Sequence, residues 1–141
     1  MSDNAPPPQV WPTLRARDAR ALIDFYVSAF GFTETVAYTG DDGVVHHAEL
    51  AWPPGGGIML GQDREDASGR HWSLAPGTFG GYAVTRDAAH TDEIFARAVD
   101  AGAKPIAEPY DTDYGSHDCT VLDPEGNHWQ FGTYPGHPAT G

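Results

Sequence analysis

The spacing of apolar residues predicts two amphipathic helices. In residues 17–32 the apolar positions recur every three or four residues, which is the period of an α-helix. Asp18 is the expected N-cap and Gly31 the terminator, because a short acceptor side chain binds the first free N–H groups and glycine adopts the left-handed conformation that follows many helices. Residues 90–104 repeat the pattern, with Gly102 as the stop. The apolar stripes are Leu22, Phe25, Tyr26, Ala29 and Phe30 in the first helix and Ile94, Phe95, Ala98 and Val99 in the second.

The two helices belong to an internal repeat. The offset that carries Gly31 onto Gly102 also aligns the strand-like segments on either side of each helix. Each half then contains one strand, one helix and three further strands. A duplicated βαβββ unit of the α+β class is therefore predicted. The offset aligns Trp11 with Tyr82, His47 with Asp118, and Met59 with Gln130.

The chain is predicted to form one domain of two modules. Its 141 residues are enough to bury a core without disulfide or metal support. A polar, glycine-containing segment separates the halves, as expected of a linker. The predicted parts are a flexible N-terminal arm (1–9), a first module (10–62), a linker (63–78), a second module (79–134) and a tail (135–141).

Alternation along the strands predicts which side chains share a face. In residues 44–50, Val44, Ala48 and Leu50 belong against the helix, so Val45, His47 and Glu49 point to the opposite, open face. The open faces of both modules are expected to form a cup-shaped mixed sheet with the helices outside. Aromatic rings with a few polar groups are typical of a small-molecule pocket. The predicted lining is Trp11, Thr13, His47, Glu49, Met59, Tyr82, Val84, Asp118, Thr120, His128 and Gln130.

Other candidates lie around the second module. Tyr110 and Tyr114 are expected in a loop that covers the cup or forms a plain surface turn. Trp11 and Tyr82 are either stacking platforms for a planar or cationic ligand or core residues. His117 and Cys119 alternate onto the helix side and are expected to be structural.

Charge and cysteine content narrow the class of partner. Eight Lys and Arg residues against twenty Asp and Glu give a formal charge of −12, which repels nucleic acid and anionic membranes. The acidity favours either a cleft that attracts cations or a solvated surface. One cysteine, no signal-peptide pattern and no long apolar run lead us to expect a cytoplasmic protein.

Several motifs together resemble the vicinal oxygen chelate superfamily. They are "DFYVSAFGF", "HAEL", "FARAVDAGA", "PYDTDYGS" and "DPEGNHWQFGTY", and the resemblance extends from about Val10 to Tyr134. This superfamily contains glyoxalase I, ring-cleaving dioxygenases and bleomycin-resistance proteins. The chain is most similar to the glyoxalase-like or bleomycin-resistance-like branch. The resemblance implies the glyoxalase/bleomycin-resistance fold and a homodimer with pockets between subunits.

The resemblance also implies where a metal would bind. Metal-dependent relatives take ligands from the first and last strands of each module, which correspond here to Trp11, Met59, Tyr82 and Gln130. Only Gln130 has a suitable ligand atom, because an indole, a thioether and a phenol are poor ligands for divalent cations. We therefore expect no metal at the usual position. A displaced site built from His47, Glu49, Asp118, His128 and Gln130 remains an alternative.

Three functions stay open at the level of sequence. The first is a metal-free protein that binds an aromatic or cationic compound in the cup, as in antibiotic sequestration. The second is a metal-dependent lyase, isomerase or dioxygenase. The third is a metal-free acid–base enzyme in which His47, oriented by Glu49, accepts a proton. A hydrogen-bonded His47–Glu49 pair that only positions a ligand is the simpler interpretation of these two residues.

Overall fold

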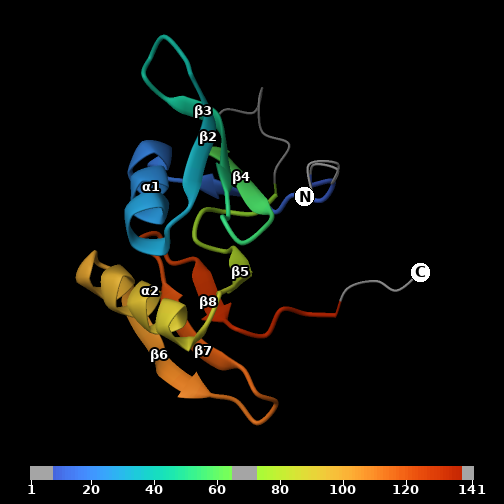
Figure 1. Ribbon diagram of the computed structural model, residues 1–141. Coiled ribbons are helices and arrows are strands. Elements are labelled where there is room, and N and C mark those ends of the chain that lie inside the picture. Colours follow the sequence, from blue (N-terminus) through green and yellow to red (C-terminus); the bar gives the residue numbers. More distant parts are fainter. Residues whose placement is uncertain (1–7, 65–72, 138–141) are drawn as a thin grey trace.

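The chain folds into two βαβββ modules, as predicted. The computed structural model describes residues 8–64 and 73–137 (Figure 1). Most of the predicted arm, half of the predicted linker and the end of the predicted tail therefore lie outside the described residues. The first module contains β1 (Thr13–Ala16), α1 (Ala19–Phe25), the π-helical turn η1 (Tyr26–Phe30), β2 (Thr33–Thr39), β3 (Val45–Ala51) and β4 (Gly57–Gln62). The second contains β5 (Gly80–Val84), α2 (Ala88–Asp100), β6 (Lys104–Asp111), β7 (His117–Leu122) and β8 (His128–Gly132).

Each module forms its own four-stranded open sheet. The strand orders are β1-β4-β3-β2 and β5-β8-β7-β6, with β1–β4 and β5–β8 parallel and the other pairs antiparallel. Figure 1 shows α1 and α2 on the same side of the two sheets. The predicted α+β architecture is confirmed. Neither helix of the described residues has the length and apolar character of a membrane span.

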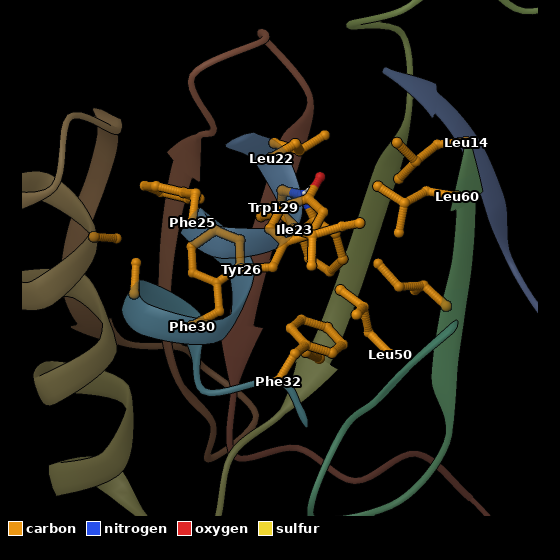
Figure 2. Packing of buried hydrophobic residues seen from close by; sticks show 14 of the residues in the cluster. Leu14, Leu22, Ile23, Phe25, Tyr26, Phe30, Phe32, Leu50, Leu60 and Trp129 are labelled. Carbon is orange, nitrogen blue, oxygen red and sulfur yellow. Dashed lines mark hydrogen bonds between the residues drawn. The ribbon is translucent and has the colours of Figure 1, made fainter. Parts of the chain in front are cut away.

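One aromatic core joins the two modules. The rings of Tyr26 and Phe30 stack at 5.5 Å, and Trp129 and Phe131 of β8 lie 5.3 Å from Tyr26 and 4.7 Å from Phe30 respectively. Figure 2 shows these helix-borne rings beside Trp129, with Leu14, Leu50 and Leu60 of the first sheet on the other side. Burying a side chain of this size stabilises a fold by roughly 1.5–3 kcal/mol. Helix α1 and η1 therefore contribute to the cores of both sheets.

The turn between β7 and β8 is organised by Asp123. Its buried carboxylate accepts hydrogen bonds from the main-chain N–H groups of Glu125 (2.9 Å) and Asn127 (3.0 Å). It also accepts a bond of 2.6 Å from the hydroxyl of Tyr26 in the first module. The side-chain oxygen of Asn127 accepts the N–H of Phe79, just before β5. The Asp123 carboxylate thus links the turn to the first module, and the Asn127 amide links the turn to the start of the second sheet.

Glu125 in the same turn binds the start of α1. Its two carboxylate oxygens accept the main-chain N–H groups of Arg17 (2.7 Å) and Asp18 (2.9 Å). The Arg17 guanidinium in turn donates to the carbonyls of Glu125 and Pro76. Asp18 is the N-cap that the sequence predicts, because its side chain accepts the N–H of Ala21. The "DPEGN" motif therefore serves as a clasp between modules; we call residues 123–127 the clasp.

The internal repeat is less regular than one offset suggests. The helix stops Gly31 and Gly102 both have positive φ, as expected. The same offset carries the N-cap Asp18 onto Ala89, whereas the N-cap of α2 is Asp87. The first helical segment is therefore shorter than its counterpart. Its last turn is π-helical, whereas α2 remains α-helical.

This difference corrects one alignment in the first strands. Thr13 lies opposite Met59 in the parallel β1–β4 pair, as Tyr82 lies opposite Gln130 in the β5–β8 pair. By strand register the counterpart of Tyr82 is thus Thr13, whereas the offset between the glycine stops predicts Trp11.

A second correction concerns Val45, which we expected on the open face. It is 2% exposed and belongs to the core. Tyr38 pairs with His47, but the next residue, Thr39, pairs with Val45, so β3 contains one extra residue between the two pairs. Such a bulge reverses the alternation of side chains beyond it.

We predict that Glu125→Ala lowers the free energy of unfolding by about 1–3 kcal/mol. The change removes two hydrogen bonds to a carboxylate that is only 10% exposed, and leaves two N–H groups at a helix start without their acceptor. Urea unfolding followed by tryptophan fluorescence measures the effect. Glu108→Ala, at an exposed position of β6, is the matched control and should change stability by less than about 0.5 kcal/mol. Equal stabilities of the two variants would contradict the role of the clasp.

Candidate functional site

The open face of the first sheet carries a histidine–glutamate pair. His47 Nε2 lies 2.8 Å from Glu49 Oε2, and the Tyr38 ring stacks on the imidazole with centroids 6.1 Å apart. The two side chains are 39% and 29% exposed, so a ligand can reach both. Met59 lies next to Glu49 on β4, and Thr13 lies next to Met59. This geometry suits either positioning of a polar ligand group or proton transfer.

Asp118, which we expected to contact a ligand, is not accessible to one. Its side chain is fully buried, and its carboxylate accepts hydrogen bonds from Ser116 Oγ (2.5 Å) and Gln130 Nε2 (2.9 Å). A Cβ at Gly132 would collide with this carboxylate and lie 2.7 Å from the Tyr82 hydroxyl oxygen. Glycine at position 132 is therefore needed for the network. Burial makes Asp118 part of the wall rather than a direct ligand contact, which strand parity alone could not indicate.

The other candidates on the second sheet differ in access. Thr120 is 8% exposed, so little of it is available to a ligand. His128 is exposed at the start of β8, one step before Trp129. Gln130 is half-buried and uses its amide nitrogen to bind Asp118.

Tyrosines surround the buried Asp118 network. Tyr82 is 42% exposed and its hydroxyl donates to the Tyr134 carbonyl at 2.7 Å, while the Tyr114 and Tyr134 rings meet edge-to-face at 5.7 Å. Burial raises the pKa of the Tyr82 phenol, so this group stays a neutral donor. Tyr110 lies in β6 opposite Asp118, not in a covering loop as expected, whereas Tyr114 lies in the turn after β6. The contribution of Tyr134, which follows β8, was missed from sequence because no strand pattern points to it.

A cleft of about 520 Å³ opens beside these tyrosines. It lies between β5, the β3–β4 turn and the segment before β1. The buried rings of Phe32, Trp52 and Trp129 form its inner wall, and Trp52 Nε1 donates to the Val84 carbonyl at 2.8 Å. The described residues that line it carry no charged side chain. They are Pro12, Phe32, Trp52, Pro54, Gly55, Gly57, Ile58, Phe79, Gly80, Gly81, Tyr82, Ala83, Val84, Trp129 and Pro135.

Most of this cleft was not predicted from the sequence; of the predicted lining, Tyr82 and Val84 border it. The one local signal is "AWPPGGG" (51–57), in which a tryptophan ends a strand just before a rigid turn. That pattern does not indicate that Trp52 reaches the second module.

The positions of the usual metal ligands do not suit a divalent cation. Trp11 lies against Gly57 and donates its indole N–H to a carbonyl, and Thr13, its replacement by strand register, offers a neutral hydroxyl. Met59 and Tyr82 add a thioether and a protonated phenol. Gln130 supplies the one carbonyl oxygen with ordinary affinity for a hard cation. This donor set does not fit the metal that the family implies.

The displaced metal site also lacks the required grouping. Within residues 8–64 and 73–137, no three His, Cys, Asp or Glu side chains lie close enough together to hold a metal ion. His47 and Glu49 lie on the first sheet, and Asp118 and His128 on the second.

His117 and Cys119 are structural, as predicted from strand parity. Burial raises the pKa of the Cys119 thiol to about 12, and the nearby Asp118 adds to the shift, so the sulfur is not a thiolate nucleophile. His117 connects α2 to the β6–β7 hairpin. Its Nε2 lies 2.7 Å from Asp92 and its Nδ1 lies 2.7 Å from Asp111, and hydrogen bonds to these two carboxylates raise the pKa of the imidazole.

Comparison with known proteins defines the class. The model of the Glyoxalase/Bleomycin resistance protein/Dioxygenase superfamily matches residues 9–131. The chain belongs to this superfamily.

Relatives of known sequence and structure agree with this assignment. Uncharacterized protein Mb0911c of Mycobacterium bovis is 37% identical over 127 residues, covering 89% of this chain and 82% of the relative. The crystal structure of TioX from Micromonospora sp. ML1 matches with a TM-score of 0.66 at 26% identity, covering 87% of this chain and 97% of that chain. Lactoylglutathione lyase from Agrobacterium tumefaciens matches with a TM-score of 0.64 at 23% identity, covering 90% and 94%, and this likeness shows the fold alone.

We predict that His117 makes the protein more stable below neutral pH than above it. Because the folded-state pKa of His117 is raised, its contribution is complete below the unfolded value of about 6.5 and is lost as the pH rises through the folded value. The difference in unfolding free energy between wild type and His117→Gln should therefore be larger at about pH 6 than at about pH 9. Ala96→Gln, at an exposed and non-titrating position of α2, should leave the pH profile unchanged. A pH-independent effect of His117→Gln would contradict the ion-pair role.

Proposed function

We propose that this protein is a metal-free binding protein that holds a small aromatic compound in the cleft beside β5. The observation that supports this proposal is the cleft. Its volume of about 520 Å³ lies within the range of small-molecule sites, and buried aromatic rings form its inner wall. Because the lining side chains are uncharged, the part of the ligand that enters is an uncharged planar ring.

The mouth of the cleft suits a cationic substituent. Tyr82 belongs to both the cleft and the open face, and it touches Tyr134, which in turn touches Tyr114. The electron-rich faces of such rings attract cations. The formal charge of −12 favours the approach of a cation to the protein over that of an anion. An aromatic cation is thus the ligand class that the cleft and the charge favour together.

The biological role that fits such binding is sequestration, as in bleomycin resistance. A protein of this kind protects by stoichiometric binding and needs no reacting group in the cleft. Within this proposal the protein acts in the cytoplasm as a homodimer; the family resemblance supports the homodimer, and the single cysteine supports the reducing compartment.

We predict that naphthalen-2-ylmethylammonium, an uncharged planar ring with a cationic substituent, raises the melting temperature and changes tryptophan fluorescence. Trp52 and Trp129 line the cleft and report its occupation. Naphthalene-2-sulfonate, a planar anion, should bind at least tenfold more weakly, a difference of about 1.4 kcal/mol.

The cleft itself is tested by Gly80→Leu. Among the described residues a Cβ at this position meets one atom, the His128 carbonyl oxygen at 3.9 Å, and Gly80 has no positive φ, so a larger side chain is accommodated at a position that lines the cleft. Binding of naphthalen-2-ylmethylammonium should weaken at least tenfold. Ala96→Leu, on the exposed face of α2, should leave it unchanged. Equal binding by both variants would place the ligand elsewhere.

The His47–Glu49 pair supports a second candidate function, metal-free acid–base catalysis. The pair is hydrogen-bonded at 2.8 Å and accessible. For sequestration we expect a bound compound to be recovered unchanged after incubation, as judged by mass spectrometry. A product formed by wild type, and lost in His47→Ala while binding persists, would make the protein an enzyme.

A further inference from the structure

Strand β5 offers main-chain hydrogen-bonding groups to the cleft. One edge of β5 pairs with β8, as shown by the bonds from His128 N–H to the Phe79 carbonyl and from Thr85 N–H to the Gly132 carbonyl. In a parallel pair the groups that face the partner alternate along the strand. Residues 79, 81, 83 and 85 therefore face β8, and Gly80, Tyr82 and Val84 present their N–H and C=O groups to the other edge, which borders the cleft.

The bond from Trp52 demonstrates this alternation. Its indole N–H reaches the Val84 carbonyl from the cleft side. No hydrogen bond from the described residues reaches the main-chain N–H or C=O of Tyr82 on the same edge. The side chain of Tyr82, in contrast, is engaged through its hydroxyl. Tyr82 thus holds one main-chain donor and one acceptor beside an apolar wall.

The available edge is short. Trp52 occupies the Val84 carbonyl, and the strand begins at Gly80, so among the described residues Gly80 and Tyr82 present both groups unbonded, and Tyr82 is the one inside the strand. Adding a peptide strand of several residues needs a longer edge. A ligand with a single amino-acid-like unit carries one N–H and one C=O on either side of one carbon. These two groups can pair with the C=O and N–H of Tyr82, as in a hydrogen-bonded pair of an antiparallel sheet.

We propose that the cleft recognises aromatic compounds that carry such an N-acyl amino amide unit, through the main-chain N–H and C=O of Tyr82. This inference rests on the proposed binding function and specifies its ligand class. The aromatic ring lies against Trp52, Phe32 and Trp129, and the amide unit pairs with the free edge of β5. An amide hydrogen bond beside an apolar wall is shielded from water, so it discriminates strongly between a ligand that makes it and one that does not.

The probe is N-acetyl-phenylalanine N-methylamide, compared with the analogue in which an ester oxygen replaces the phenylalanine N–H. Dissociation constants come from titrations monitored by tryptophan fluorescence. We expect the amide to bind about tenfold more tightly, and the Tyr82 main-chain N–H resonance to move in nitrogen–proton correlation spectra as the amide is added.

Tyr82→Pro removes the main-chain donor specifically. The Tyr82 N–H points away from β8, so proline at this edge position leaves the β5–β8 pairing intact. Tyr82→Ala is the matched control, because it loses the same side chain but keeps the N–H. The amide should weaken further in the proline variant than in the alanine variant, and the preference for amide over ester should persist in the alanine variant.

The outcomes separate this inference from the binding function. Equal binding of amide and ester, with an unmoved Tyr82 resonance, would overturn main-chain recognition while leaving an aromatic-binding cleft. Absence of binding by both compounds and by naphthalen-2-ylmethylammonium would overturn the binding function as well. If the proline variant does not fold, the resonance shift and the amide-to-ester ratio of the wild type still decide the question.

Discussion

A buried carboxylate, that of Asp123, is the constraint on which the arrangement of the two modules depends. A carboxylate that is 4% exposed must be fully hydrogen-bonded to remain in a folded protein. The donors come from its own turn, from Trp129 and from the Tyr26 hydroxyl in the other module. Burial and the nearby carboxylate raise the pKa of Tyr26, so its hydroxyl keeps the proton that it donates. The same turn directs Glu125 to the start of α1, and η1, which continues α1, carries the rings that cover Trp129. These contacts together fix the position of Trp129, which forms part of the inner wall of the cleft.

Much of the fold could be predicted because it depends on local rules. Asp18, Gly31 and Gly102 act as the caps and stops that their residue types indicate. Alternation correctly assigned Trp129, Phe131 and Cys119 to the core, and it placed His47 beside Glu49. The errors arise where the backbone departs from regularity. The extra residue in β3 moves Val45 inward, and the shorter first helical segment makes Thr13 the counterpart of Tyr82. The periodic pattern of apolar residues cannot indicate an extra residue in a strand or a shortened helix.

The site was less predictable because it depends on contacts between modules. Trp52 follows β3 in the first module, yet its indole N–H binds a carbonyl of β5 in the second. No local pattern indicates such a contact. The burial of Asp118 likewise results from its neighbours, since Ser116 and Gln130 satisfy its oxygens and Gly132 leaves the space they need.

Equivalent glycines near the ends of β4 and β8 have different polar groups beside them in the two modules. Gly61 and Gly132 are related by the same offset as the helix stops, and each leaves room for side chains from neighbouring strands. At Gly61 the space is occupied by the Arg15 guanidinium, with the exposed His47–Glu49 pair on the adjoining strand. At Gly132 it is occupied by the Asp118 carboxylate and the Tyr82 hydroxyl. The polar groups of the second open face therefore bond largely to one another and form a rigid wall. A ligand gains little by competing with satisfied bonds, whereas the main-chain groups of Tyr82, which bond to no described residue, need only exchange water for the ligand. For this reason the edge of β5, more than the open face of its sheet, is where the second module can confer specificity.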